Sequence, residues 1–199
     1  MVVFENKDWA SSSLFPDSKF DEDAQYWVED GSEISNFILN SNGHFKVTES
    51  DETGKILSIE EYIPIEELKE NKKQEINQAC SSLIYSGYDY NGEHYDLSNE
   101  DQINILAWSS VAQQGSSVPY HSSGNPCRVY SDKEFLALVS AITAFKTYNL
   151  TYCNLLKQQV DEMVDSADIE NVKYGKTVLN AKYQSILEAV VGKYDETNN

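Results

Sequence analysis

Three side chains of types that bind metal ions lie in the middle of the chain: His94, His121 and Cys127. Imidazole and thiolate are ligands that zinc prefers, and structural zinc sites take four of them at close spacing. The sequence places no Cys-x-x-Cys pair and no fourth ligand beside these three residues. We therefore expect no metal site, and we interpret His121 and Cys127 as structural residues of a hairpin.

The sequence also gives no support for a nucleophilic cysteine or for a phosphate-binding loop. A reactive thiol needs a setting that lowers its pKa, such as a helix N-terminus. No helix N-terminus follows Cys127, and Cys153 falls inside a helical pattern. Gly115 and Gly124 are not followed by the Gly-Lys-Ser/Thr of a phosphate-binding loop. We expect no catalytic residue and no cofactor, and hence no enzyme.

Tyrosines are the remaining candidates for a functional surface. The chain has 13 Tyr, 7 Phe and 3 Trp, and a Tyr ring combines a large apolar area with one polar group. Alternation along a hairpin brings Tyr88, Tyr90 and Tyr95 close together, and Tyr120 lies in a second hairpin. Core packing and a patch that faces a partner both stay open. We take these four tyrosines as candidate partner-interface residues.

The charge is strongly negative, with 33 acidic and 15 basic residues and a net charge of −18. Nucleic acids and anionic membranes are bound by clustered Lys and Arg, so we expect neither as a partner. Residues 1–64 hold the densest acidity, with 14 acidic and 4 basic side chains. A solvated surface explains this, and a face that mimics nucleic acid or binds a basic partner is the alternative.

The expected cellular location follows from the absence of a membrane-span pattern, a secretory signal and a disulfide framework. No apolar run approaches the ~20 residues of a membrane span, and the N-terminus lacks the pattern of a secretory signal. Three widely spaced cysteines do not form a disulfide framework. Cys80 and Cys153 sit in apolar helical patterns, which predicts reduced core residues. We expect a protein made in a cytoplasm.

Residues 1–64 have the pattern of strands and loops. The run 37–39 is a short apolar segment, and residues 5–23 are polar and predict an irregular arm. The segments 44–48 and 55–62 flank a turn and predict a hairpin. Pro64 marks a boundary, because helical spacing of apolar residues begins directly after it.

The rest of the chain predicts helices with two hairpins between them. A helix over 65–84 precedes a hairpin at Asn91-Gly92, the signal of a type I′ turn. Ser98 caps a helix that ends at Gly115, with an apolar stripe at Ile103, Leu106, Ala107 and Val111. A second hairpin spans 118–130.

The C-terminal part predicts two more helices. Ser131 and Glu134 form a capping box pattern for a long helix to about 165, weakened at 149–152. A last helix is expected near 181–191, with an apolar stripe at Ile186, Leu187, Val190 and Val191.

The order of these elements resembles a known domain. It is similar to an uncharacterised domain found in tail-module proteins of phages and prophages of clostridia-like Gram-positive bacteria. The resemblance runs from Leu68 to about Met163, and the matching pieces are LKENKKQEINQACSSLIYSGYDY, HYDLSNEDQINILAWSSVAQQG, VPYHSSGNPCRVYS and AFKTYNLTYCNLLKQQV. It implies a virion component or an assembly factor, with other tail or fibre proteins as partners.

These observations predict an α+β protein. We expect a small, acidic, β-rich N-terminal module over 1–64. A helical domain with three main helices and two β-hairpin insertions follows over 65–165, and a C-terminal tail with one short helix over 166–199.

The expected function is a non-enzymatic phage tail or baseplate structural protein that mediates attachment or assembly of tail fibres. A tail-fibre assembly chaperone that is absent from the virion is one alternative. An acidic inhibitor of a host defence nuclease is another. The resemblance implies synthesis in the host bacterial cytoplasm and a place in the virion tail, with a homo-oligomer in the tail left open.

Overall fold

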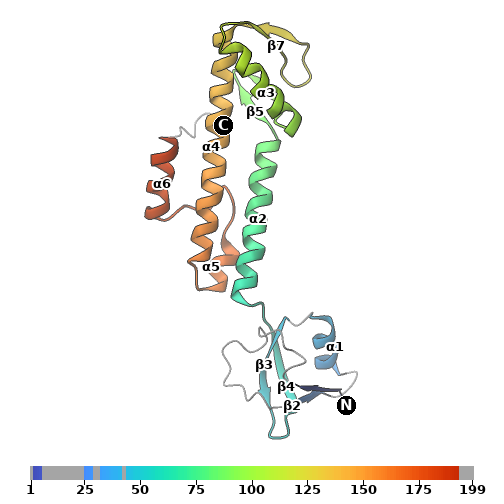
Figure 1. Cartoon of the computed structure of the whole chain (residues 1–199). Helices are drawn as coiled ribbons and strands as arrows, with labels where there is room; N and C mark the ends of the chain where they lie inside the picture. The colour runs from blue at the N-terminus through green and yellow to red at the C-terminus, as the bar shows by residue number, and fades with distance from the viewer. Residues whose placement is uncertain (1, 6–24, 29–31, 42–43, 193–199) are drawn as a thin grey trace. The chain divides into compact units, whose positions relative to one another are not determined.

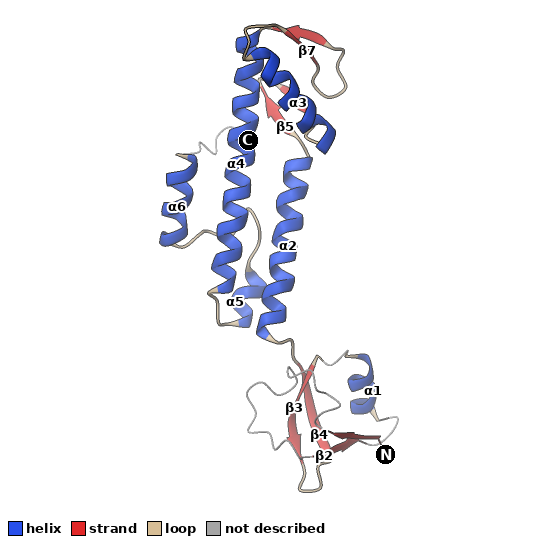
Figure 2. Ribbon diagram, in the orientation of Figure 1, coloured by secondary structure: helices blue, strands red, loops and turns tan. Residues whose placement is uncertain are grey.

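The computed structural model describes residues 2–5, 25–28, 32–41 and 44–192 and shows a mixed α+β protein (Figures 1 and 2). Its contacts divide the chain into two compact units, Met1–Glu70 and Asn71–Asn199. The dividing point lies inside a helix, six residues beyond the Pro64 boundary expected from the sequence. The expected domain limits of 1–64, 65–165 and 166–199 stay a prediction.

The described residues of unit 1 form two antiparallel strand pairs and the helix α1, before the start of α2. Strand β1 pairs with β2, and β3 pairs with β4 through a register that shifts after Val47. The pairing of β3 with β4 confirms the expected hairpin. The elements are β1 (Val2–Glu5), β2 (Gln25–Val28), α1 (Glu33–Asn40), β3 (Phe45–Ser50) and β4 (Ile56–Glu61).

Helix α1 corrects the expectation that residues 1–64 contain only strands and loops. Ser32 caps this helix by accepting a hydrogen bond from the Ser35 backbone N–H at 3.1 Å. The side chain of Ile38 packs in a small core with Val28, Phe45 and Ile56. The short apolar run at 37–39 is therefore part of a helix. The arm predicted over 5–23 lies outside the described residues from position 6 onward.

Unit 2 is organised around one long helix. In Figure 1 the orange helix α4 lies between α2 and α6. Hydrogen bonds from α2 to α4, such as Lys73 Nζ to Asp161 Oδ1 at 2.8 Å, hold this arrangement. The elements are α2 (Ile65–Tyr85, whose first residues belong to unit 1), β5 (Tyr88–Tyr90), β6 (Glu93–Tyr95), α3 (Asn99–Ala112), β7 (Val118–Tyr120), β8 (Arg128–Tyr130), α4 (Asp132–Asp161), α5 (Ser166–Asn171) and α6 (Ala181–Val191).

These bounds confirm the expected helices and both hairpins of this region. The expected tail with one short helix is wrong, because a second helix, α5, precedes α6 there. The weak helix formers predicted at 149–152 do not interrupt α4, which runs unbroken for 30 residues. Asn149 is compatible with the helix since its side-chain Nδ2 donates to the Phe145 carbonyl at 2.9 Å. Tyr152 and Cys153 are buried in the same turn. Tertiary packing therefore overrides the low helix propensity of this segment.

The predicted apolar stripe of α3 is also wrong. The buried residues of this helix are Ile105, Ser109 and Ala112, whereas Ile103 and Leu106 are exposed. In α6 the buried residues are Tyr183 and Leu187, so only part of its predicted stripe packs inward. Both helices carry apolar residues on more than one face, and periodicity alone cannot choose the face that is buried.

Ser98 and Ser131 cap α3 and α4 as predicted, with one difference at Glu134. Ser98 and Asp101 form a complete capping box at α3. Ser131 caps α4 by accepting from the Glu134 backbone N–H at 3.2 Å. The Glu134 carboxylate instead accepts from the Arg128 guanidinium at 2.7 Å. Glu134 therefore forms an ion pair with Arg128 of the second hairpin instead of the predicted hydrogen bond to the Ser131 backbone N–H.

Two glycines of the first hairpin have backbone conformations that other residues avoid. Gly92 has φ +79°, beside Asn91 at φ +52°, which confirms the predicted turn. Gly87 has φ +97°, and a Cβ there would lie 2.3 Å from His94 Nε2 and 2.7 Å from the Tyr95 carbonyl oxygen. A Cβ at Gly92 would meet nothing within 4 Å.

This contrast gives a matched test of the hairpin. Gly92→Ala should cost about 1–2 kcal/mol through left-handed backbone strain alone. Gly87→Ala adds a clash with a backbone oxygen and should cost clearly more, by on the order of a further 1 kcal/mol or above. Urea unfolding followed by circular dichroism measures both free energies. Equal losses for the two variants would contradict the close approach at Gly87.

Candidate functional site

The four tyrosines proposed from the sequence as interface residues are mostly in the core. Tyr88, Tyr95 and Tyr120 are buried, and Tyr90 is half-buried. Of the two alternatives left open by the sequence, core packing is the one found for Tyr88, Tyr95 and Tyr120. Pairing of Tyr88 with Tyr95 across the first hairpin does bring two of them together as predicted. The strand faces that carry them turn toward α4 and the second hairpin.

An aromatic layer explains the burial. The Tyr88 ring lies 4.9 Å from that of Phe145 on α4, centroid to centroid. Tyr120 contacts Phe135 edge-on at 5.3 Å. The hydroxyls of Tyr95 and Tyr130 lie 3.0 Å apart in the interior. Burial raises the pKa of Tyr120 to about 12, so its hydroxyl stays protonated and neutral inside the layer.

The three potential metal ligands do not converge. His94 Nδ1 lies 2.6 Å from Asp89 Oδ1, and this hydrogen bond raises the pKa of His94. The ring of His121 stacks on Tyr120, and Cys127 is exposed. Across the part of the chain that the structure describes, no cluster of three or more His, Cys, Asp or Glu could hold a metal.

The two other thiols are buried, which confirms their predicted place in the core. Cys80 Sγ lies 3.6 Å from the Asn149 carbonyl, and Cys153 Sγ lies 3.6 Å from Asn77 Oδ1. Burial raises the pKa of Cys153 to about 11. The thiolate that a nucleophile requires is therefore disfavoured at this position.

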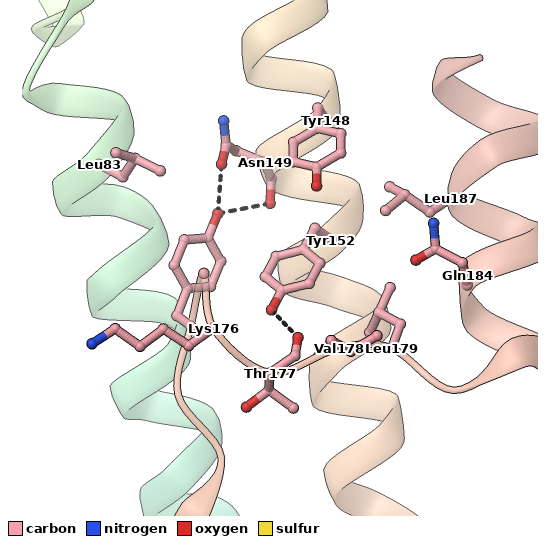
Figure 3. Close-up of a pocket in the computed structure, with 12 residues that line it drawn as sticks. Leu83, Tyr148, Asn149, Tyr152, Lys176, Thr177, Val178, Leu179, Gln184 and Leu187 are labelled. Carbon is pink, nitrogen blue, oxygen red and sulfur yellow. Dashed lines mark hydrogen bonds between the residues drawn. The ribbon is translucent and has the colours of Figure 1, made fainter. Parts of the chain in front are cut away.

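One candidate site is a tyrosine-lined pocket of about 530 Å³ in unit 2 (Figure 3). Helix α4 supplies one wall, the segment 174–179 supplies the floor, and α6 and α2 close the sides. The lining residues are Leu83, Tyr148, Asn149, Tyr152, Tyr174, Gly175, Lys176, Thr177, Val178, Leu179, Gln184 and Leu187. Its volume falls in the range of about 300–1,000 Å³ that is typical of ligand pockets.

Hydrogen bonds hold the floor segment against α4. The Tyr174 hydroxyl donates to Asn149 Oδ1 at 2.9 Å and lies 3.2 Å from the Asn149 carbonyl (Figure 3). The Tyr152 hydroxyl donates to the Thr177 carbonyl at 2.5 Å. Gln159 Oε1 accepts from the Asn180 backbone N–H at 2.7 Å, where α6 begins. The pocket is therefore built on a fixed floor.

Ring geometry gives the pocket an aromatic wall. Tyr148 and Tyr152 are one helical turn apart, and their rings are parallel within 3° at a centroid distance of 6.3 Å. Tyr174 meets Tyr152 edge-on at 5.2 Å. Flat aromatic faces beside the exposed side chains of Lys176 and Val178 can receive an apolar or aromatic group of a partner.

The raised pKa values of Tyr152 and Tyr174 disfavour either hydroxyl as a general base or nucleophile. Burial raises the pKa of Tyr152. Burial, together with the neighbouring Cys80 thiol, raises the pKa of Tyr174 above the usual range for tyrosine. Both hydroxyls stay protonated at neutral pH, and both donate their protons within the protein. A general base or nucleophile would have to release that proton.

The described residues line two further hollows. One of about 700 Å³ in unit 1 is bordered mainly by exposed side chains of α1. The other, of about 590 Å³, is a groove between α3 and α4. In the described part of the chain no helix is long and apolar enough to cross a membrane.

The sequence interpretation missed the pocket tyrosines. Tyr148 and Tyr152 have the i, i+4 spacing that places two side chains on one face of a helix, and this signal was available. Tyr174 could not have been assigned in this way, because it lies 25 residues beyond Asn149 and reaches it only through the fold. The pocket depends on that long-range contact.

Comparison with known proteins places the chain in a family. Residues 67–174 match the family described as "Domain of unknown function (DUF4376)". The match covers more than half of the 199-residue chain, so this α+β protein belongs to that family. The matched region begins in α2 and ends at Tyr174, on the pocket floor. No curated protein and no solved structure matches the chain.

The hydrogen bond between Tyr174 and Asn149 gives a test of the pocket floor. Tyr174→Phe should lower the free energy of unfolding by about 1–3 kcal/mol, because the buried Asn149 oxygen loses its donor. Tyr85→Phe is the matched control. It removes a hydroxyl that bonds the side-chain oxygen of Asn99 at 3.2 Å on the exposed surface, where water replaces the lost donor. Similar losses for both variants in urea unfolding would contradict a buried, organising role for Tyr174.

Proposed function

We propose that this chain is a non-enzymatic protein of a phage tail or baseplate that docks tail fibres or neighbouring tail proteins. The context comes from the resemblance of residues 68–163 to a tail-module domain. The docking site is the tyrosine-lined pocket of unit 2. In this proposal the acidic, β-rich N-terminal module and the helical domain with its three main helices and two hairpins act as separate parts of one adaptor.

The observation that carries the proposal is the composition of the pocket. Tyrosine is enriched at the centres of protein–protein interfaces, because its rigid ring buries a large area at a low entropic cost. Three tyrosines line this pocket, and the exposed apolar side chain of Val178 lies with them. An apolar residue exposed beside an aromatic wall is the arrangement that a docking partner covers.

The fixed floor supports binding rather than catalysis. The hydroxyls of Tyr152 and Tyr174 are occupied by internal hydrogen bonds, so the site is organised before a partner arrives. A site that needs no rearrangement loses less conformational entropy on binding. The partner that fits is a protein segment with an apolar or aromatic side chain, because the pocket offers ring faces more than free charges.

The proposal is tested with two valines of nearly equal exposure. Val178 lines the pocket and is 82% exposed, whereas Val164 is 86% exposed and lies outside the pocket. In a phage that carries this gene, Val178→Asp should reduce the amount of this protein in purified tails by about tenfold or more, since a charge would be desolvated in the interface. Val164→Asp should leave it unchanged. Quantitative mass spectrometry of the particles measures both.

Folding is the control, and both variants should keep the melting temperature of the natural chain because neither side chain is buried. Equal incorporation of the two variants would contradict the pocket as the docking site. If the chain is found on newly made fibres but not in particles, its role is that of a tail-fibre assembly chaperone and not of a structural protein. Tight binding to a basic host nuclease, with no tail association, would favour the acidic inhibitor.

A further inference from the structure

The outward face of α3 has an apolar ridge beside a groove that no acidic side chain lines. Ile103 is 66% exposed and Leu106 is 69% exposed, and Ala107 beside them is exposed as well. The groove between α3 and α4, of about 590 Å³, is lined by Asn99, Gln102, Ile103, Ile105, Leu106, Ser109, Val139, Ile142, Thr143 and Lys146. Two large aliphatic side chains at i, i+3 on one exposed helix face are unusual for a surface that only meets water.

We propose that this face, the α3 ridge with its adjoining groove, binds the same face of a second copy of the chain and forms a two-fold symmetric dimer. A two-fold interface uses one patch on both partners, so the patch must be complementary to itself. This face meets that condition, because it carries both the projecting side chains and the hollow that can receive them. Ile103 and Leu106 of each copy enter the groove of the other.

The charge distribution favours a second copy at this face. The chain has a net charge of −18, so two copies repel each other wherever their carboxylates meet. None of the residues that line this groove is acidic. Its single charged group, the Lys146 amine, donates to the side-chain oxygen of Gln102 within the groove. The acid of α3 on this face is the exposed Glu100, three residues before Ile103, and its Oε2 lies 3.3 Å from Ser98 Oγ at the helix N-terminus.

The small size of the α3 face leads us to expect a weak dimer. Helix α3 has 14 residues and is therefore about 20 Å long, which is short for an obligate interface. The dimer is expected to dissociate at concentrations on the order of 10 μM. The dimer would hold two tyrosine-lined pockets, and two linked pockets bind a partner with repeated segments more tightly than one pocket does. The dimer does not depend on the proposed function, since it involves different residues.

The test is the oligomeric state of the full chain by sedimentation equilibrium from about 1 to 500 μM, the range that brackets this dissociation constant. The natural chain should show a reversible monomer–dimer equilibrium. Ile103→Glu combined with Leu106→Glu should weaken it by at least tenfold, because four carboxylates would face each other. Val129→Glu is the matched control, because Val129 is 71% exposed on β8, outside the groove, and it should leave the equilibrium unchanged.

A milder variant, Leu106→Gln, keeps the test valid if the double variant unfolds, and it should weaken the dimer in the same direction without a change in melting temperature. A natural chain that stays monomeric up to the highest concentration would overturn the proposal. So would self-association that the α3 variants leave intact, or that Val129→Glu weakens equally.

Discussion

The second unit depends on one buried polar residue in the middle of its longest helix. Asn149 is buried inside α4, where an amide without partners would be costly. Its nitrogen donates to the Phe145 carbonyl, and its oxygen accepts from Tyr174. The second bond reaches across the fold and fixes the segment that leads to α6. This contact links the middle of α4 to the pocket floor, alongside the hydrogen bonds that Tyr152 and Gln159 make to the same segment.

Burial of aromatic rings determines which surfaces remain free for binding. Tyr88 and Tyr120 of the hairpins pack against Phe145 and Phe135 on α4, so their rings are not available to a docking partner. The surfaces left with exposed apolar groups include the tyrosine-lined pocket and the α3 ridge. These two surfaces use different helix faces, so one chain can meet a second copy and a different partner at once.

Local signals in the sequence predicted local structure well. The Asn91-Gly92 turn and the cap at Ser98 are formed by side chains within a few residues of each other, and both were predicted. Burial was harder to predict. Ile103 and Leu106 were assigned to the core, whereas Ile105 and Ser109 occupy it. The choice of face depends on contacts between residues far apart in the chain, and composition carries no information about them.

We expect the contact between Asn149 and Tyr174 to stabilise α4 across the weak helix formers at 149–152. Native-state hydrogen exchange of the natural chain measures this directly. The backbone amides of residues 149–156 should exchange as slowly as those of residues 138–145, in a single cooperative opening. Faster exchange centred on 149–152, through a separate local opening, would contradict it.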